Sequence, residues 1–294
     1  MRKIAVYPGC MMPTEQYAYE MSIRATLPRF DIEIVEVDGF SCCGEPLKSI
    51  SQMLTLTLSS RNLAIADREG LDLLIPCPMC HLALSEAKRI LDSDEEMRDR
   101  INSKLSAEEL TYGGTTRLFH IIDLLHDEIG LDAIKEKVTS PLGDRNIATH
   151  YGCHIIRPAE LGRPVDSEDP KKMESILGAL GFRSEYYPEK LDCCGAPLLP
   201  VHPETSLTKT GQKLEAVQQR GFDGMATACP WCHKMYDSRQ KKAGETVGAK
   251  LHVPVLYITQ LLGLAMGIDG ADLGLELNLS PVDELIHEKE GGEG

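Results

Sequence analysis

The sequence predicts an α/β protein built from two tandem, pseudo-symmetric domains with parallel sheets. Three observations predict it. One cysteine pattern occurs twice along the 294 residues, strand-like segments alternate with helix-like ones in both halves, and each cysteine group follows a strand-like segment. Such alternation is typical of Rossmann-like domains, whose crossovers are right-handed and whose functional loops lie at the carboxyl ends of the strands. We therefore expect the cysteine loops of each half to converge at one sheet edge.

The repeated pattern reads C, then CCG, then CPxC, and it includes all ten cysteines. The flanks repeat as well: YPGC corresponds to HYGC, SCCGEPL to DCCGAPL, and PCPMCH to ACPWCH. Self-similarity at this distance indicates a duplicated domain. We predict domains over 1–140 and 141–294, joined at the turn-rich stretch 138–146. The cysteines are Cys10, Cys42, Cys43, Cys77 and Cys80 in the first half and Cys153, Cys193, Cys194, Cys229 and Cys232 in the second.

Each half alternates the two kinds of segment in the same order. Gly70 ends one helix-like segment, and Pro78 suits the first position of the next helix. The halves close with corresponding apolar segments, 118–125 and 255–262. The strand-like segments are 3–9, 32–40 and 71–77, then 146–153, 182–194 and 222–232; the helix-like segments are 13–27, 51–70 and the stretch from Pro78, then 171–181 and 206–221.

Composition limits the classes of partner. The formal net charge of −14 argues against non-specific nucleic-acid binding, which needs clustered Lys and Arg side chains. The most apolar stretch, 253–268, is shorter than the roughly 20 residues of a spanning helix, so we expect a buried helix and no membrane insertion. The N-terminal segment lacks the apolar core of a signal peptide. We therefore expect a cytoplasmic protein whose cysteines serve metal or redox chemistry rather than disulfides, with a frayed polar tail over 287–294.

Five cysteines per half fit an iron–sulfur site better than two alternatives. A zinc site of four thiolates leaves Cys10 and Cys153 unused, and a dithiol redox pair leaves three cysteines unused in each half. A cluster with several irons can use a fifth thiolate, for instance as a bridge. Gly44 and Gly195 permit unusual backbone angles or close approach of a cluster. Zinc in one or both halves and thiol redox chemistry remain the alternatives.

With these motifs, the chain resembles the CCG-motif, or cysteine-rich domain, family, and the two tandem copies resemble the B subunit of heterodisulfide reductases. The resemblance covers nearly the whole chain and all ten cysteines. It implies two noncubane 4Fe–4S clusters, each held by the five cysteines of one half with one thiolate shared between irons. It also implies an enzyme, a disulfide oxidoreductase that reduces the coenzyme M–coenzyme B heterodisulfide of methanogenesis.

The resemblance implies partners too. These are the ferredoxin-like C subunit, the flavin-containing A subunit, and, behind them, a hydrogenase or formate dehydrogenase. CCG domains also occur in iron–sulfur subunits of glycolate and lactate oxidation systems, which often carry further ferredoxin-type cysteines on the same chain. No cysteine of this chain lies outside the repeated pattern. An electron-relay component of such a dehydrogenase complex is therefore the alternative function.

Disulfide reduction takes two electrons, so two clusters that each pass one electron suit it, with the substrate between the two halves. His154 directly follows a motif cysteine and is the candidate catalytic proton donor. Arg157 and Lys234 are candidates for binding the acid groups of the implied substrate. His81 and His233 follow the last cysteine of each set and are candidates for substrate binding or for donating N–H to a cluster. Structural roles are the alternative for each.

Overall fold

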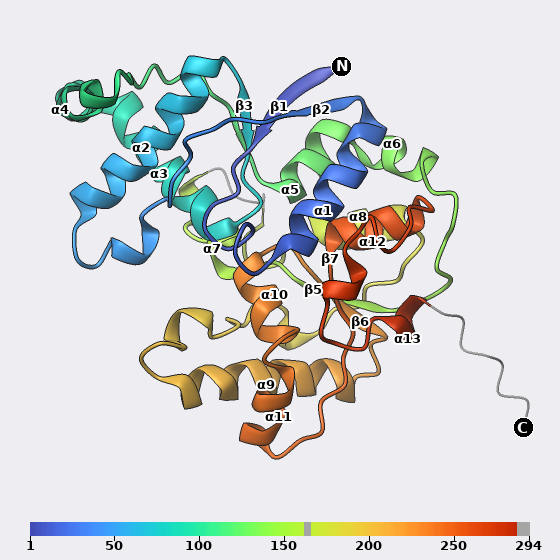
Figure 1. Cartoon of the computed structure of the whole chain (residues 1–294). Helices are drawn as coiled ribbons and strands as arrows, with labels where there is room; N and C mark the ends of the chain where they lie inside the picture. The colour runs from blue at the N-terminus through green and yellow to red at the C-terminus, as the bar shows by residue number, and fades with distance from the viewer. Residues whose placement is uncertain (162–165, 287–294) are drawn as a thin grey trace, which may run out of the picture.

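Two parallel sheets organise the chain in a computed structural model, which describes residues 1–161 and 166–286 (Figure 1). The first sheet has the order β2-β1-β3-β4 and the second the order β5-β6-β7, and every neighbouring pair is parallel. The predicted fold class is confirmed. The domain boundary at 140/141 stays a prediction, and the expected frayed tail, 287–294, lies outside the described residues. The strands are β1 (Arg2–Val6), β2 (Ile32–Val35), β3 (Asp72–Leu74), β4 (Leu118–Phe119), β5 (Ile147–His150), β6 (Gly224–Thr227) and β7 (Val255–Tyr257).

The helices lie where the apolar periodicity and the helix-capping residues predict them. Ser51 begins α2 by accepting a hydrogen bond from the Leu54 amide at 3.2 Å, and Gly70 ends it with φ 65°. Pro78 is the first residue of α3. The helices are α1 (Tyr17–Thr26), α2 (Gln52–Glu69), α3 (Pro78–Ser93), α4 (Glu95–Leu105), α5 (Ile121–Asp123), α6 (Leu131–Glu136), α7 (Cys153–Ile156), α8 (Lys172–Ala179), α9 (Pro203–Gln219), α10 (Pro230–Tyr236), α11 (Gln240–Val247), α12 (Ile258–Ala265) and α13 (Asp283–Ile286).

The predicted strand over 182–194 is wrong. Only one isolated bridge forms there, between Asn146 and Arg183, and the chain then makes a 3₁₀ turn over Pro188–Leu191. Proline has no amide hydrogen for a strand ladder, which favours the turn. The predicted strand over 32–40 ends at Val35, so an irregular loop leads from it to the paired cysteines.

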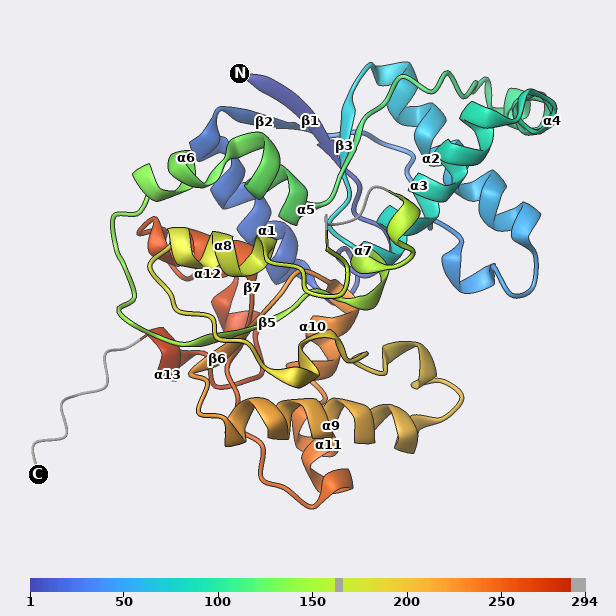
Figure 2. The ribbon, with the colours of Figure 1, turned by 180° about the vertical axis from the view of Figure 1, so that it is seen from behind.

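The two halves share an apolar core. Helices α1 and α12 pack against one another, as Figure 1 shows, and the Ser22 and Thr259 hydroxyls hydrogen-bond at 2.7 Å between them. The ring of Tyr19 stacks on that of Tyr257 with centroids 3.9 Å apart. On another side, α6 of the first half packs against α8 of the second (Figure 2). These contacts set one half in a defined orientation on the other.

The apolar stretch 253–268 divides into β7 and α12, and all eight residues of α12 are buried. The expectation of a buried helix is therefore confirmed. Among the described residues, no helix combines the length and the apolar character needed to cross a membrane.

Candidate metal centre

The cysteines follow the carboxyl ends of β1, β3, β5 and β6, as predicted, with the paired cysteines on separate loops. All ten are free thiols. Within each half, the five thiols form one continuous string in which each thiol lies close enough to the next to shift its pKa. In the first half its order is Cys10, Cys42, Cys43, Cys80 and Cys77. In the second half its order is Cys153, Cys193, Cys194, Cys232 and Cys229.

The two strings meet where the halves meet. The Cys77 and Cys229 thiols lie close enough to shift one another's pKa, and both are buried. The other end of each string is more accessible: Cys10 is exposed, and Cys153 is partly exposed. The ten thiols therefore form a single path from the surface of one half, through the interface, to the surface of the other.

His120 joins the two halves beside this meeting point. Its Nε2 lies 2.9 Å from the carbonyl oxygen of Pro76 and 3.2 Å from that of Ala228, the residues that precede Cys77 and Cys229. Both partners are acceptors, so Nε2 carries the hydrogen and Nδ1 accepts from the Ile122 amide at 3.3 Å. The sequence analysis missed this residue. Its position in the largely apolar segment 118–125 was the available signal.

The CCG turns are built alike in both halves. Gly44 and Gly195 have φ values of 85° and 86°, in the left-handed region that favours glycine. A Cβ on Gly44 would lie 3.0 Å from the Thr55 Cα, and one on Gly195 would lie 2.6 Å from the Ser206 carbonyl oxygen. The expected unusual backbone angles are confirmed. Each glycine packs closely against the helix that follows its motif, Gly44 against α2 and Gly195 against α9.

Hydroxyl groups on those helices hold each turn. In the first half, Thr55 donates to the Gly44 carbonyl at 2.8 Å and Ser59 donates to the Cys43 carbonyl at 2.8 Å. The second half repeats this with Ser206 donating to Gly195 at 2.9 Å and Thr210 donating to Cys194 at 2.8 Å. The sequence analysis assigned these hydroxyl residues no role. The signal was a hydroxyl residue at the same spacing after both CCG motifs.

A glycine also precedes the first cysteine of each half and packs on the last cysteine of that half. A Cβ on Gly9 would lie 3.1 Å from the Cys80 Sγ, and one on Gly152 would lie 3.7 Å from the Cys232 Sγ. Both glycines have positive φ. A larger residue at Gly9 would therefore crowd the Cys80 thiol, and at either position it would strain the backbone.

The electrostatics favour a cationic group among the thiols. A hydrogen bond from Cys42 lowers the pKa of Cys43 to about 4, one from Cys153 lowers the pKa of Cys193 to about 2, and one from Cys229 lowers the pKa of Cys77. Hydrogen bonding to these thiolates, or burial, raises the pKa of the other seven. Metal ions bind thiolate, so a metal would displace the shared protons. The donor set fits an iron–sulfur group.

Two of the predicted helper residues lie near Cys153. The Nδ1 of His154 is 3.2 Å from the Cys153 Sγ, so the structure brings this imidazole to the thiol string. The side chain of Arg157 is 58% exposed and forms an ion pair with Glu168 at 3.5 Å. A catalytic role for His154 and a substrate-binding role for Arg157 stay predictions.

The other three candidates are enclosed. Lys234 forms an ion pair with Glu15 of the first half and lies 5.8 Å from the centre of the Trp231 ring. His233 is buried, stacks on Tyr257 at 4.0 Å, and has its Nδ1 3.1 Å from the side-chain oxygen of Gln16. His81 is also buried. Substrate binding by these residues stays a prediction, and for Lys234 and His233 the contacts observed link the two halves.

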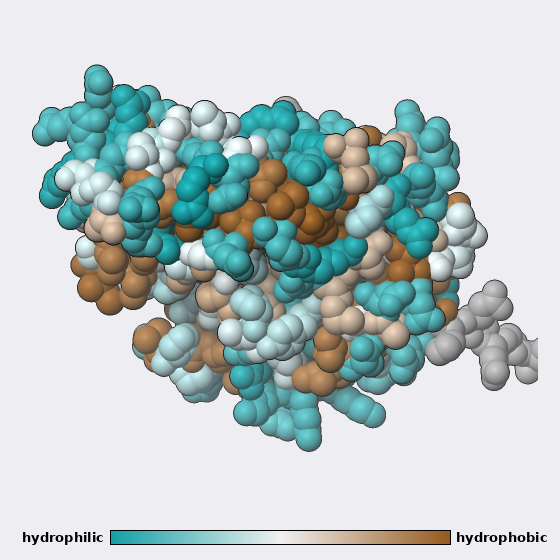
Figure 3. All heavy atoms as spheres, turned by 45° about the horizontal axis from the view of Figure 1, so that its top comes forward, coloured by the Kyte–Doolittle hydropathy of each residue, from teal (hydrophilic) through white to brown (hydrophobic). Residues whose placement is uncertain are grey.

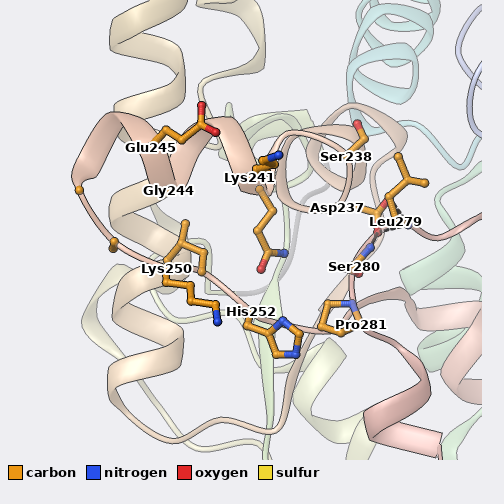
Figure 4. Close-up of a pocket in the computed structure, with 14 residues that line it drawn as sticks. Asp237, Ser238, Lys241, Gly244, Glu245, Lys250, His252, Leu279, Ser280 and Pro281 are labelled. Carbon is orange, nitrogen blue, oxygen red and sulfur yellow. Dashed lines mark hydrogen bonds between the residues drawn. The ribbon is translucent and has the colours of Figure 1, made fainter.

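Two surface pockets lie at different distances from the thiols. One, of about 790 Å³, lies beside α11, and its lining in the described structure includes no cysteine (Figure 4). Lys241, Lys250 and His252 give it a partly basic wall. The other, of about 610 Å³, is lined in part by His81, the residue after Cys80. The second pocket is therefore the one that approaches the thiol string.

His150 is a further residue that the sequence analysis missed. It is buried, and one of its ring nitrogens lies within 4.8 Å of the Sγ atoms of Cys194 and Cys232. Within the described part of the chain, neither ring nitrogen has a hydrogen-bond partner. Burial lowers its pKa well below the usual value. The signal was the histidine of HYGC where the first half has the tyrosine of YPGC.

Comparisons with known proteins agree with this arrangement. A family model described as the CCG cysteine-rich domain matches residues 4–85 and 147–237. The chain is 35% identical over 282 residues to the B subunit of the ferredoxin/F420H2-dependent CoB-CoM heterodisulfide reductase of Methanosarcina acetivorans, covering 95% of this chain and 94% of that one. It is also 31% identical over 285 residues to the 8-methylmenaquinol:fumarate reductase membrane anchor subunit of Wolinella succinogenes, covering 97% and 99% of the two chains.

A solved structure shares the fold. A hypothetical protein from Helicobacter pylori aligns with a TM-score of 0.75 and 19% identity, over 95% of this chain and 52% of that one. At this identity the likeness concerns the fold alone. The family model covers both halves, each with a complete C, CCG and CPxC set. The chain therefore belongs to the CCG cysteine-rich domain family, with two copies of the domain in tandem.

Proposed function

We propose that this chain is the iron–sulfur subunit that reduces a disulfide, the coenzyme M–coenzyme B heterodisulfide, to two thiols. The family and the relatives named as B subunits of heterodisulfide reductases support the broader assignment, an oxidoreductase component of the iron–sulfur type. One observation supports the more specific assignment, disulfide reduction: two complete sets of five thiols meet at Cys77 and Cys229. Two one-electron centres in such proximity suit a two-electron reduction.

The reaction consumes two electrons and two protons for each disulfide and yields two thiols. Two noncubane 4Fe–4S clusters, one in each set of five cysteines, would supply the electrons one at a time. His154 would hold a proton at Nδ1, 3.2 Å from the Cys153 Sγ, and deliver it to a product thiolate. Arg157, with its exposed guanidinium, would attract the acid groups of the substrate.

The proposed function requires an electron donor on another chain. We assign this role to the ferredoxin-like C subunit, supplied by the flavin-containing A subunit with a hydrogenase or formate dehydrogenase behind it, in the cytoplasm. Ile50 and Val201 support a protein contact, because they are 80% and 68% exposed shortly after the CCG motif of each half. The face in Figure 3 carries several hydrophobic patches among hydrophilic residues.

A relay of electrons without disulfide chemistry is the second candidate. The relative from Wolinella succinogenes favours it, since its name assigns it to a quinol:fumarate reductase. In that case the two centres would pass electrons between other subunits, as in a dehydrogenase complex of the glycolate or lactate type. Zinc in one half would also leave a single redox centre. Both candidates predict that the isolated chain reduces no disulfide.

The first experiment is anaerobic metal and sulfide analysis of the purified chain with its visible spectrum. We expect about eight irons and about eight sulfides per chain, the content of two four-iron clusters. The second step is turnover of the heterodisulfide with a reduced viologen as the electron donor. Clusters without turnover would favour the relay, about four irons with one zinc would leave one centre, and zinc alone would refute both redox functions.

A further inference from the structure

The second half contains polar groups that its own protein contacts leave unsatisfied. Both ring nitrogens of His150 and the hydroxyl of Tyr236 are buried without a hydrogen-bond partner among the described residues. The two rings pack edge to face, with centroids 4.9 Å apart. An unpaired buried polar group destabilises a fold, so two adjacent ones point to a missing binding partner.

The position of His150 indicates what that partner is. One imidazole nitrogen and the Sγ atoms of Cys194 and Cys232 all lie within 4.8 Å of one another, and all three residues are buried. Imidazole nitrogen and thiolate are together a common ligand set for zinc and iron. His150 is the last residue of β5, so the sheet holds its backbone while the edge contact with Tyr236 orients the ring.

The first half is different at both positions. Tyr7 stands where the second half has His150, and its hydroxyl donates to the Ser41 carbonyl at 2.5 Å, which satisfies it. Leu84 stands four residues after Cys80, where the second half has Tyr236 four residues after Cys232. In the first half, Tyr7 and Leu84 thus stand at the positions of His150 and Tyr236. The pairing of a buried histidine with a buried tyrosine beside the thiols is therefore a feature of the second half.

We propose that His150 is a sixth protein ligand of the metal centre in the second half and binds iron through an imidazole nitrogen. The inference rests on the proposed iron–sulfur function. The Tyr236 hydroxyl donates a hydrogen bond within the same centre. A hydrogen bond to a cluster and a further ligand on one iron both change the reduction potential of an iron–sulfur centre. The centres of the two halves should therefore have different reduction potentials.

Pulsed electron paramagnetic resonance of the reconstituted full-length chain tests this proposal. We expect the strong hyperfine coupling of a directly bound nitrogen, which changes isotope pattern when the protein is labelled with ¹⁵N-histidine. The coupling should vanish in His150→Asn and persist in Tyr7→Phe, the matched change in the first half. It should also persist in His154→Ala, which removes the imidazole beside Cys153. The labelled wild type gives an answer even if His150→Asn fails to fold.

The outcomes separate the inference from the function on which it rests. Iron–sulfur clusters that show only weak nitrogen couplings, or a strong coupling that His150→Asn retains, would overturn ligation by His150 and leave the proposed function intact. A chain that binds zinc alone would overturn both. A redox titration gives the independent readout: His150→Asn should shift one of two midpoint potentials and leave the other unchanged.

Discussion

The thiols of Cys77 and Cys229 lie beside one another at the interface between the two halves, close enough that each shifts the pKa of the other. Each is the last member of its string, and each caps the helix of its CPxC motif, α3 or α10. His120 donates toward the carbonyl that precedes each of them. The two metal-binding sets therefore share one boundary, and the residues that fix it do not belong to the cysteine pattern.

His120 should stabilise this boundary. In His120→Leu the carbonyl oxygens of Pro76 and Ala228 both lose the imidazole donor, and the Pro76 oxygen keeps the Tyr19 hydroxyl at 3.4 Å. We expect the free energy of unfolding to fall by about 1–3 kcal/mol, measured by urea denaturation of the metal-free chain. His126→Ala, a nearby change that removes a contact with Asp127, is the control. Equal losses in the two variants would contradict a bridging role.

The two sets should hold their metal separately. Cys43→Ser and Cys194→Ser change the same motif position in the first and second half, and both thiols are buried. We expect each variant to keep about half of the wild-type iron and sulfide, because each set holds one cluster, and to lose disulfide turnover. Metal analysis and the viologen-linked assay measure this. Complete loss of iron from either single variant would show that the sets assemble one joint centre.

The hydroxyl of Thr55 should hold the first CCG turn. Thr55→Val removes the hydrogen bond to the Gly44 carbonyl, and we expect a loss of about 1 kcal/mol in the free energy of unfolding together with slower cluster incorporation. The control is Thr57→Val in the same helix, because the Thr57 hydroxyl bonds only to the Met53 carbonyl of its own helix. If the two variants bind iron at the same rate, the hydroxyl does not organise the turn.

Lys213 should make stability depend on pH. The side chain is buried in α9, and burial lowers its pKa from 10.5 to about 7, although it donates to the Glu189 and Lys190 carbonyls. Between about pH 7 and pH 10.5, the Lys213 amine binds more protons in the unfolded state than in the folded state. Its contribution to the free energy of unfolding therefore becomes more favourable as the pH rises through this range. Below about pH 7 the penalty for charging the buried amine is constant.

The test compares Lys213→Met with wild type in denaturant titrations of the metal-free chain from pH 6 to pH 10. The free energy of unfolding of wild type minus that of the variant should increase as the pH rises above about 7. Below about pH 7 this difference should be constant. The exposed Lys209 of the same helix provides the control Lys209→Met, whose difference from wild type should stay flat. A flat difference for Lys213→Met would show that the amine stays charged in the fold.

Local sequence signals predicted most of the elements, and they failed where a segment depends on distant partners. Gly70 and Pro78 marked the end of α2 and the start of α3 correctly, because capping is a property of a few neighbouring residues. The segment 182–194 matched the strand of the first half by position in the repeat. In the fold it has one bridge and a turn, because Pro188 and the buried, paired Lys190 suit a turn.

The sequence by itself determined the duplication, the ten cysteines and their place at strand ends, since these follow from residue type and spacing. Only the tertiary structure decided that Cys77 meets Cys229, that His120 bridges the halves, and that the buried His150 lies beside two thiols while the Tyr7 hydroxyl is satisfied by the Ser41 carbonyl. These relationships join residues far apart along the chain. They depend on how α1 packs on α12 and α6 on α8, and close packing between distant segments leaves no periodic signal in the sequence.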